Sequence, residues 1–321
     1  MEQFEGRIAV ITGGGTGMGR ELARVLSAQG CHVAMCDLSE DNMSQTKMLC
    51  ERDAPAGTRI STFEADVSDP DQLRAFRSHV GEVHDTKVIH LLFNNAGIAG
   101  AGSFVLDDRE EWDKPFSVCW AGVYESTRAF LPMLLAAPEG HVVNTSSVNG
   151  FWASLGPNTA HTAYSSAKFA VKGFTEALVN DFRLNAPHLS ASVVMPGHIG
   201  TSIAINSAAF FGNSPKQLSD DELEAAASRL QGLGLAAEDA GPEDIRQLLQ
   251  GLSEAFRDAA PTTARQAAEI ILDGVRNKRW RILVGADAEI LDRLVREAPE
   301  EAYTTGFMER FQAESPWMLG S

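Results

Sequence analysis

Tyr164 and Lys168 are the residues whose types and spacing point most directly to chemistry. They lie four positions apart in the segment AYSSAKFAVKGF. Four residues advance an α-helix by about 400° and about 6 Å, so both side chains share one face. An ammonium beside a phenol stabilises the phenolate and lowers the tyrosine pKa from about 10. The pair therefore predicts a tyrosine that accepts a proton near neutral pH. The same spacing is also common on solvated helix faces, so it needs support from other residues.

A glycine-rich turn, Thr12-Gly-Gly-Gly-Thr-Gly-Met-Gly19, stands between the apolar run RIAVIT and a helix-like stretch. Glycines let main-chain N–H groups approach a pyrophosphate, and the start of the helix adds partial positive charge. The spacing is GxxxGxG, and Arg20 and Glu21 stand where a Walker loop needs Lys and Ser or Thr. We expect a dinucleotide here, bound by Thr12, Gly13, Gly15, Thr16, Gly17, Met18 and Gly19.

Asp37 ends the next apolar run, CHVAMCD, 18 positions after Gly19. A carboxylate at this place accepts hydrogen bonds from the adenosine ribose hydroxyls and repels a 2′-phosphate. Neither Arg nor Lys sits beside it in the sequence. The sequence therefore predicts NAD as cofactor rather than NADP, with Leu38 as a neighbouring contact.

The segments that position these residues are short apolar runs that alternate with helix-like stretches. We expect strands at about 7–12, 31–37, 59–66, 88–94, 141–147 and 190–196, and helices at about 18–29, 40–51, 70–83, 110–136 and 160–185. This alternation predicts an α/β fold with a doubly wound, Rossmann-like parallel sheet. Helices on both faces also explain why the strands are continuously apolar.

The stretch from about 202 to 261 interrupts this alternation. Apolar residues recur at helical spacing within 243–257, which predicts an amphipathic helix with one buried face. A helix over about 262–277, a strand over 281–285, a short helix over about 287–296 and a tail over 297–321 follow. No repeat or linker divides the chain, so we expect residues 1–321 to form a single domain with a helical insertion over 202–261.

Composition excludes several classes of protein. The chain has 321 residues with 27 Lys and Arg against 43 Asp and Glu, a net charge of −16, which argues against nucleic acid as a partner. The sequence contains no run of about 18 apolar residues, so it predicts no membrane span. The start MEQFEGRIAV lacks the pattern of a secretory signal. We therefore expect a cytoplasmic protein with reduced cysteines. The scattered histidines and cysteines predict no metal site.

Taken together, the motifs resemble the short-chain dehydrogenase/reductase superfamily, in its compact single-domain branch. The resemblance covers residues 5–202 and the strand RILVG. After the glycine turn come Asp66-Val67, Asn94-Asn-Ala-Gly97, Asn144-Thr-Ser-Ser147, Tyr164-x-x-x-Lys168, Pro196-Gly197 and Thr201. All follow an expected strand except Tyr164-x-x-x-Lys168, which lies in the helical stretch at about 160–185. Each motif alone is weak, but the set in this order is specific.

The resemblance implies a role for each matched residue. Tyr164 would take the substrate hydroxyl proton, Ser147 would hydrogen-bond the same oxygen, and Lys168 would hold the nicotinamide ribose. The other cofactor contacts would be made near the adenine by Asp66 and Val67, along the cleft by Asn94, Ala96 and Gly97, and near the nicotinamide by Pro196, Gly197, Ile199 and Thr201.

The chain departs from the family pattern in two places. The family's fourth catalytic residue, an asparagine in V-N-x-x-G-V, aligns with Cys119. That asparagine is understood to stabilise a helix irregularity whose main-chain carbonyl holds a water of a proton relay, and a carbonyl survives the replacement. Ser147 and Tyr164 are also 17 positions apart, with the extra length in Gly156–His161. A loop there would border the substrate, which makes Phe151, Trp152 and His161 candidate pocket residues, with packing or surface positions as the alternative.

Family resemblance also predicts a substrate-binding loop after the last cofactor motif. The insertion over 202–261 would form a lid over an apolar pocket, with Phe210 and Phe211 facing the substrate, or would simply enlarge the core. A lid favours a bulky hydrophobic alcohol or ketone, such as a steroid, terpenoid, aromatic or lipid-like molecule. We also expect a homodimer or homotetramer built on the helices at about 110–136 and 160–185. Tyr303, Phe307 and Phe311 would pack across a subunit boundary or on their own subunit.

The resulting hypothesis is an NAD-dependent dehydrogenase that interconverts a secondary alcohol and a ketone. Two alternatives stay open at this point. One is a cofactor-binding regulatory protein that turns over poorly because of Cys119, and the other is an NADPH-dependent carbonyl reductase. Asp37 opposes the second alternative, and the complete set of Ser147, Tyr164 and Lys168 opposes the first.

Overall fold

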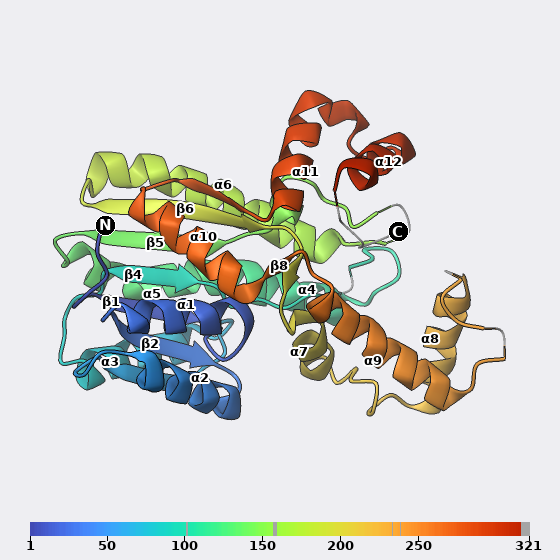
Figure 1. Ribbon diagram of the computed structural model, residues 1–321, viewed down its shortest axis with the longest axis horizontal. Helices are drawn as coiled ribbons and strands as arrows, with labels where there is room; N and C mark the ends of the chain where they lie inside the picture. Colours follow the sequence, from blue (N-terminus) through green and yellow to red (C-terminus); the bar gives the residue numbers. More distant parts are fainter. Residues whose placement is uncertain (101, 157–158, 233, 238, 316–321) are drawn as a thin grey trace.

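A seven-stranded parallel sheet forms the centre of the protein (Figure 1). The computed structural model describes residues 1–100, 102–156, 159–232, 234–237 and 239–315. Every neighbouring pair in the sheet is parallel, in the order β3-β2-β1-β4-β5-β6-β9. The strands are β1 (Ile8–Thr12), β2 (His32–Asp37), β3 (Ile60–Glu64), β4 (Leu91–Asn94), β5 (Gly140–Thr145), β6 (Leu189–Pro196) and β9 (Arg281–Val284). The predicted doubly wound α/β fold is confirmed.

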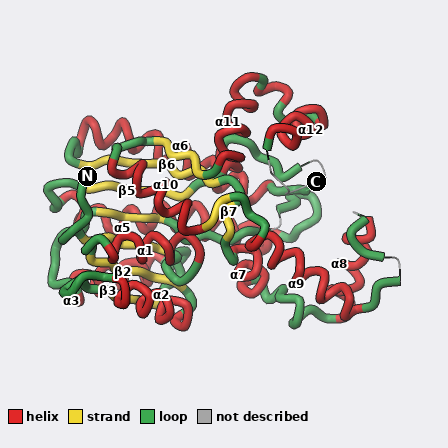
Figure 2. The backbone as a smooth tube through the Cα atoms, in the orientation of Figure 1, coloured by secondary structure: helices red, strands yellow, loops and turns green. Residues whose placement is uncertain are grey.

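Helices cover both faces of this sheet (Figure 2). One face carries α1 (Gly17–Ala28), α2 (Glu40–Asp53) and α10 (Ala264–Arg276), and the other carries α3 (Pro70–Val83), α5 (Gly122–Leu135) and α6 (Thr162–Asn185). Local sequence fixes several helix starts, since Ser39 caps α2 and Asp69 caps α3 just before Pro70. The apolar faces of these helices and the buried strands form two large cores, one on each side of the sheet.

The helix predicted over 110–136 is divided into three parts. It consists of α4 (Arg109–Phe116), a π-helical segment (Ser117–Ala121) and α5. Cys119 is the central residue of the π-helical segment, which places a helix irregularity at the position where the family has its asparagine. Single π-helical turns are rare in proteins, and those that do occur are often found at functional sites.

The insertion leaves the sheet and returns to it at one point. Its stem is a small pair of parallel strands, β7 (Ile199–Gly200) and β8 (Thr262–Thr263). Between them lie α7 (Ile203–Phe210), α8 (Asp220–Gly232) and α9 (Pro242–Asp258), and Figure 1 shows α8 and α9 extending away from the sheet. Their apolar faces pack on each other through Leu223, Leu230 and Ile245. The prediction that the whole insertion covers a pocket is therefore wrong for α8 and most of α9, because these two helices bury their apolar faces together.

The C-terminal segment forms a third core of its own. After α11 (Ala286–Glu297), the short 3₁₀ helix η3 (Pro299–Glu301) and α12 (Thr305–Glu314) bring Phe307 and Phe311 onto Trp152. The indole N–H of Trp152 donates to the carbonyl of Ala302 at 2.6 Å. Phe307 and Phe311 therefore pack on their own subunit. The prediction of Trp152 as a pocket residue is wrong, because the ring is committed to this core.

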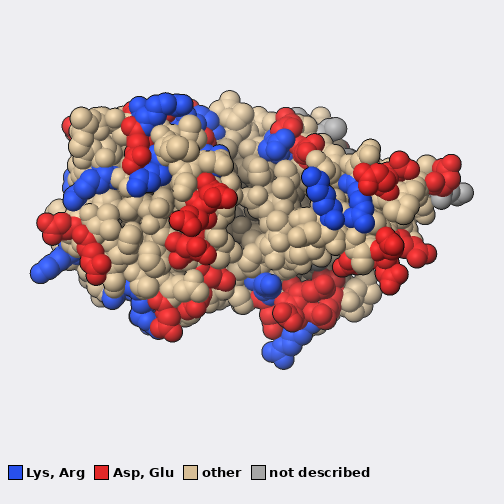
Figure 3. All heavy atoms as spheres, turned by 90° about the horizontal axis from the view of Figure 1, so that it is seen from below, with Lys and Arg blue, Asp and Glu red and all other residues tan. Residues whose placement is uncertain are grey.

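Acidic side chains gather in several groups on the face drawn in Figure 3, with basic side chains interspersed among them. No continuous basic surface is present on that face. None of the helices in the described ranges combines the length and the apolar composition that a membrane span requires.

Candidate active site

The glycine turn between β1 and α1 is shaped by contacts that leave no room for side chains. Gly13 has φ +67°, and a Cβ there would lie 2.8 Å from the Cα of Ala96. A Cβ at Gly19 would collide with the carbonyl oxygen of Gly13. Gly17 also lies in the left-handed region, at φ +54°. The bare backbone therefore lies at the start of α1, where N–H groups and the helix dipole favour an anion.

Thr12 and Asn95 hold this turn against β4. The Thr12 hydroxyl accepts hydrogen bonds from the main-chain N–H groups of Asn95 and Ala96, both at 3.1 Å. The Asn95 side chain donates to the carbonyls of Thr12 and Gly13, both at 3.2 Å. The sequence analysis did not single out Asn95, although it stands inside the Asn94–Gly97 motif.

Asp37 ends β2 beside this turn. Its Oδ2 accepts from the N–H of Gly15 at 2.9 Å, and its Oδ1 accepts from the N–H of Ser39 at 3.2 Å. Arg20 also lies in this corner, where its guanidinium donates to the carbonyl of Gly15 and, at 2.9 Å, to the Thr46 hydroxyl. The pKa of Arg20 is lowered by burial, and Asp37 opposes that shift. No Arg or Lys is next to Asp37 in the sequence, but the fold brings the Arg20 guanidinium close enough for the two charges to interact.

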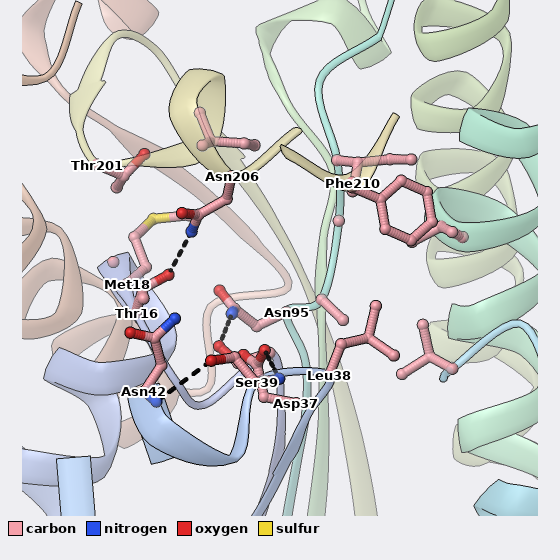
Figure 4. Close-up of a pocket in the computed structure, with 18 of the residues that line it drawn as sticks. Thr16, Met18, Asp37, Leu38, Ser39, Asn42, Asn95, Thr201, Asn206 and Phe210 are labelled. Atoms are coloured by element: carbon pink, nitrogen blue, oxygen red, sulfur yellow. Dashed lines mark hydrogen bonds between the residues drawn. The ribbon is translucent and has the colours of Figure 1, made fainter. Parts of the chain in front are cut away.

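A cleft of about 420 Å³ opens at the carboxyl ends of β1, β2 and β4 (Figure 4). Its size is typical of a small-molecule site. Among the predicted residues it brings together Gly13, Thr16, Gly17, Met18, Asp37, Leu38, Asp66, Val67, Ala96, Gly97, Thr201 and Phe210. Sequence analysis missed several further lining residues, namely Ser39, Asn42, Asn95, Ile98, Val118 and Asn206. Carboxyl-end positions of a parallel sheet are the usual ligand site of this architecture.

Some predicted cofactor residues lie behind the cleft. Asn94 is buried, and its amide donates to Thr127 at 2.9 Å and Asn144 at 2.8 Å, so it links β4 to β5 and α5. The side chain of Ile199 packs into the core beside α10, and Gly197 lies against Asp287. The prediction that Asn94 lines the cleft is thus wrong for its side chain, and Asn95 takes that place.

Helix α6 and the end of β5 bring the predicted catalytic side chains together. The ammonium of Lys168 is buried, lies 5.3 Å from the centre of the Tyr164 ring, and donates to the carbonyl of Thr145 at 2.9 Å. Ser147 follows β5 and hydrogen-bonds Tyr164. A Cβ at Gly97 would lie 3.6 Å from the Lys168 ammonium nitrogen. Gly97 lines the cleft, so the Lys168 ammonium lies directly behind the cleft wall, although none of the three side chains is itself a lining residue.

The pKa of Tyr164 lies above its ordinary value. Burial raises it, and Lys168 and the hydrogen bond with Ser147 both lower it, while Cys119 raises it. The prediction of a net lowering is therefore wrong. Lys168 acts in the expected direction, but desolvation of a phenolate in this partly buried position outweighs it.

Cys119 lies next to the same cluster. Its thiol is buried and donates to the carbonyl of Ile98 at 3.4 Å. A Cβ at Gly97 would lie 3.5 Å from the sulfur. The thiol thus joins the π-helical segment to the loop after β4. The fourth expected catalytic position is present as a helix irregularity with a different side chain.

The comparisons with known proteins agree with this geometry. The sequence model of the family described as short chain dehydrogenase matches residues 7–210. This chain belongs to the short-chain dehydrogenase/reductase family. It is 32% identical over 296 residues to the Mycobacterium tuberculosis protein named "Putative oxidoreductase SadH", covering 92% of each chain.

Two solved structures extend the likeness. A short chain dehydrogenase/reductase from Burkholderia phymatum, solved in complex with NAD, has 25% identity, a TM-score of 0.73 and full coverage of both chains. Levodione reductase has 26% identity and a TM-score of 0.64, covering 88% of this chain and 96% of that one. The family membership makes this protein an oxidoreductase that acts on small molecules.

In this short-chain dehydrogenase/reductase, α7 crosses the mouth of the cleft. Asn206 donates to the Thr16 hydroxyl at 3.0 Å (Figure 4). The hydroxyl of Ser207 accepts from the N–H of Ala99 at 2.8 Å. Phe210 projects toward the cleft, and the ammonium of Lys114 lies 4.7 Å from the centre of its ring. The part of the insertion that lines the cleft is therefore α7.

The remaining predicted pocket residues take different places. The His161 ring centre lies 4.8 Å from that of Tyr164, and burial lowers the pKa of His161 to about 4, so the ring is neutral at physiological pH. Phe211 approaches Gly100 and Lys114. Phe151 packs at the edge of the C-terminal core, 5.8 Å from the Arg281 guanidinium, so its prediction as a pocket residue is wrong. The described residues contain no cluster of His, Cys, Asp and Glu that could hold a metal ion.

Proposed function

We propose that this oxidoreductase interconverts a secondary alcohol and a ketone with NAD(H). The observation that carries the proposal is the meeting of Ser147, Tyr164 and Lys168, with the Lys168 ammonium beside Gly97 of the cleft wall. A phenol between a hydroxyl and an ammonium suits proton exchange with a substrate oxygen.

The cleft fits a dinucleotide. Gly13 and Gly19 let the turn pack closely on itself and on the loop after β4, which places bare main chain at the start of α1, where a pyrophosphate would bind. Asp37 would hold the adenosine ribose, Asp66 and Val67 the adenine, and Lys168 the nicotinamide ribose, with Thr201 on the nicotinamide side. When bound, the coenzyme supplies a hydride acceptor for alcohol oxidation and a hydride donor for ketone reduction.

The side chains of this chain handle the proton. In alcohol oxidation the phenolate of Tyr164 accepts the hydroxyl proton as the C=O bond forms and hydride leaves the same carbon. Ser147 hydrogen-bonds the substrate oxygen and keeps it beside Tyr164. Lys168 stabilises the phenolate. The π-helical segment at Cys119 retains the irregular backbone, which favours turnover over a purely regulatory cofactor-binding protein.

The preference for NAD over NADP rests on Asp37. Both of its oxygens accept main-chain hydrogen bonds, which fixes the carboxylate at the ribose end of the cleft. Two acceptor directions stay available to ribose hydroxyls. The Arg20 guanidinium offsets part of this charge, but its N–H groups are bonded to the carbonyl of Gly15 and to Thr46, so the preference for NAD rests on the Asp37 carboxylate.

A bulky hydrophobic substrate suits the apolar side of the cleft. Ile98, Val118 and Phe210 line it, and Phe211 lies nearby against the loop at Gly100. Preference for small polar polyols in a panel of alcohols and ketones, followed by absorbance of the reduced nicotinamide, would contradict this part of the proposal.

We also propose a homo-oligomer through the outer faces of α5 and α6. Trp120 and Tyr124 contact Phe174 across these helices, at centroid distances of 5.5 and 6.2 Å, and Phe169 on the same helix as Phe174 is 42% exposed. An aromatic surface of this kind is typical of interfaces between subunits.

Replacing Tyr164 with Phe tests the reaction. We expect Tyr164→Phe to lower kcat by at least about 100-fold, because the proton acceptor is lost, while NAD+ affinity stays near that of the wild type. Because the pKa of Tyr164 is raised, wild-type oxidation should increase with pH through the alkaline range as the phenol loses its proton. Retained turnover in the variant, with an active wild-type preparation beside it, would refute the role of Tyr164.

A further inference from the structure

The C-terminal end of the insertion, formed by the last turn of α9 and by β8, packs closely against the segment that follows β6. β7 and β8 pair at the stem, with Ile199 opposite Thr262 and Gly200 opposite Thr263. A Cβ at Gly200 would lie 2.7 Å from the carbonyl oxygen of Arg257, in the last turn of α9. The end of α9 and the β7 strand therefore cannot shift independently without opening this contact.

His198, immediately before β7, joins the two segments through its side chain. It is buried, and its ring centre lies 4.5 Å from that of Phe256 in α9. Its Nε2 lies 2.6 Å from the carbonyl oxygen of Phe256. Because a carbonyl only accepts hydrogen bonds, Nε2 carries the proton and donates it to that carbonyl.

The main chain of His198 is held from the opposite side. Its N–H donates to Oδ2 of Asp287 at 2.6 Å, and Asp287 is fully buried at the start of α11. Gly197 and Gly285 leave the room that this carboxylate occupies, since a Cβ at either position would overlap it. One residue is thus bonded to the fixed core through its main chain and to the insertion through its imidazole.

The loop that contains His198 also reaches the cleft. Thr201 lies three residues further on and lines the cleft. Its Cγ2 would lie 3.1 Å from a Cβ at Gly17. A displacement of His198 would therefore move Thr201 relative to the glycine turn, since only β7 separates them.

We propose that His198 is a positioning residue that couples α9 to the nicotinamide side of the cleft, so that the placement of Thr201 depends on the bond between His198 and Phe256. The inference rests on the proposed function for the identity of the coenzyme. The contacts that carry it belong to the chain itself.

The experiment compares His198→Leu, which removes the donor and the ring, with His198→Gln, whose amide nitrogen replaces Nε2. We expect the Leu variant to raise the Kd for NAD+ by about 10-fold, in line with the loss of one buried hydrogen bond, and to accelerate hydrogen exchange at 199–203 and 256–258. The Gln variant should recover most of the affinity. NAD+ binding is followed by fluorescence titration, so the readout does not need turnover.

His188→Leu is the matched control. His188 also places Nε2 near a carbonyl, that of Leu135 at 3.2 Å, but at the opposite ends of α5 and β6 from the cleft. Its loss should leave NAD+ affinity unchanged. If His198→Leu does not fold, Phe256→Ala removes the ring contact and should give a smaller loss of the same kind.

The coupling would be overturned if hydrogen exchange at 199–203 and 256–258 were as slow in His198→Leu as in the wild type. It would also be overturned if all variants bound NAD+ with the affinity of the wild type. If the wild type binds no NAD+, the proposed function fails. In that case the hydrogen-exchange rate at 199–203, compared between His198→Leu and the wild type, still tests the coupling.

Discussion

Cys119 and Tyr164 illustrate how neighbouring side chains set the chemistry of this site. The thiol joins the π-helical segment to the loop after β4 through the carbonyl of Ile98. It also raises the pKa of Tyr164, in the same direction as burial. A proton acceptor with a raised pKa favours turnover at alkaline pH in the oxidation direction, and donation of a proton in the reduction direction at neutral pH.

At the same scale, Asp37 permits a sharp test of cofactor choice. We expect Asp37→Asn to keep only one of the two hydrogen bonds that the carboxylate accepts from the N–H groups of Gly15 and Ser39, because the amide nitrogen only donates, and to lose the charge that repels a 2′-phosphate. The ratio of the Kd values for NADP+ and NAD+ should therefore fall by at least about 10-fold.

Glu64→Gln is the control for Asp37→Asn, because Glu64 stands opposite Asp37 at the end of β3 but does not line the cleft. It should leave the ratio unchanged. Wild-type NADP+ binding as tight as NAD+ binding would contradict the proposed role of Asp37.

At the scale of elements, the C-terminal helices support the segment that follows Ser147. Trp152 lies five residues after Ser147 and is held by Ala302, Phe307 and Phe311. The hydroxyl of Tyr303 also accepts from the N–H of Ala153 at 3.2 Å. α11 and α12 thus fix the far end of the loop that carries one of the proposed catalytic groups.

Trp152→Ala should lower the free energy of unfolding by about 3–5 kcal/mol, because it leaves a cavity in a closed core and an unpaired carbonyl at Ala302. Trp280→Ala is the matched control, since Trp280 is 45% exposed. Its effect should stay within about 0.5 kcal/mol. Urea unfolding followed by circular dichroism measures both, and equal losses in the two variants would contradict the packing described for Trp152.

At the scale of the whole molecule, charge and exposed aromatic residues bear on assembly. The net charge of −16 opposes association through unselective contact, so an oligomer needs a defined apolar surface. The surface proposed for this contains Trp120 of the π-helical segment, Tyr124 of α5 and Phe174 of α6.

Phe169→Glu should shift the protein from an oligomer to a monomer in sedimentation velocity, because it places a charge in that proposed interface. Leu184→Glu, also on α6 and 71% exposed, tests whether the interface extends to the end of the helix. A wild type that sediments as a monomer would refute the proposed assembly.

The sequence alone determined the strands, most helices, the glycine turn and the order of the motifs. These features depend on residues close together in the chain, such as the glycines at positions 13, 17 and 19 or the cap at Asp69, and local stereochemistry acts on them directly. The same locality explains why Tyr164 and Lys168 were correctly expected on one helix face.

Only the tertiary structure decided where burial occurs and which distant groups meet. Trp152 contacts a carbonyl 150 positions away, and His198 meets a carboxylate 89 positions away. The pKa of Tyr164 and the neighbours of Asp37 likewise depend on desolvation and approach in space. No local pattern encodes these contacts, because they arise from the packing of whole elements against one another.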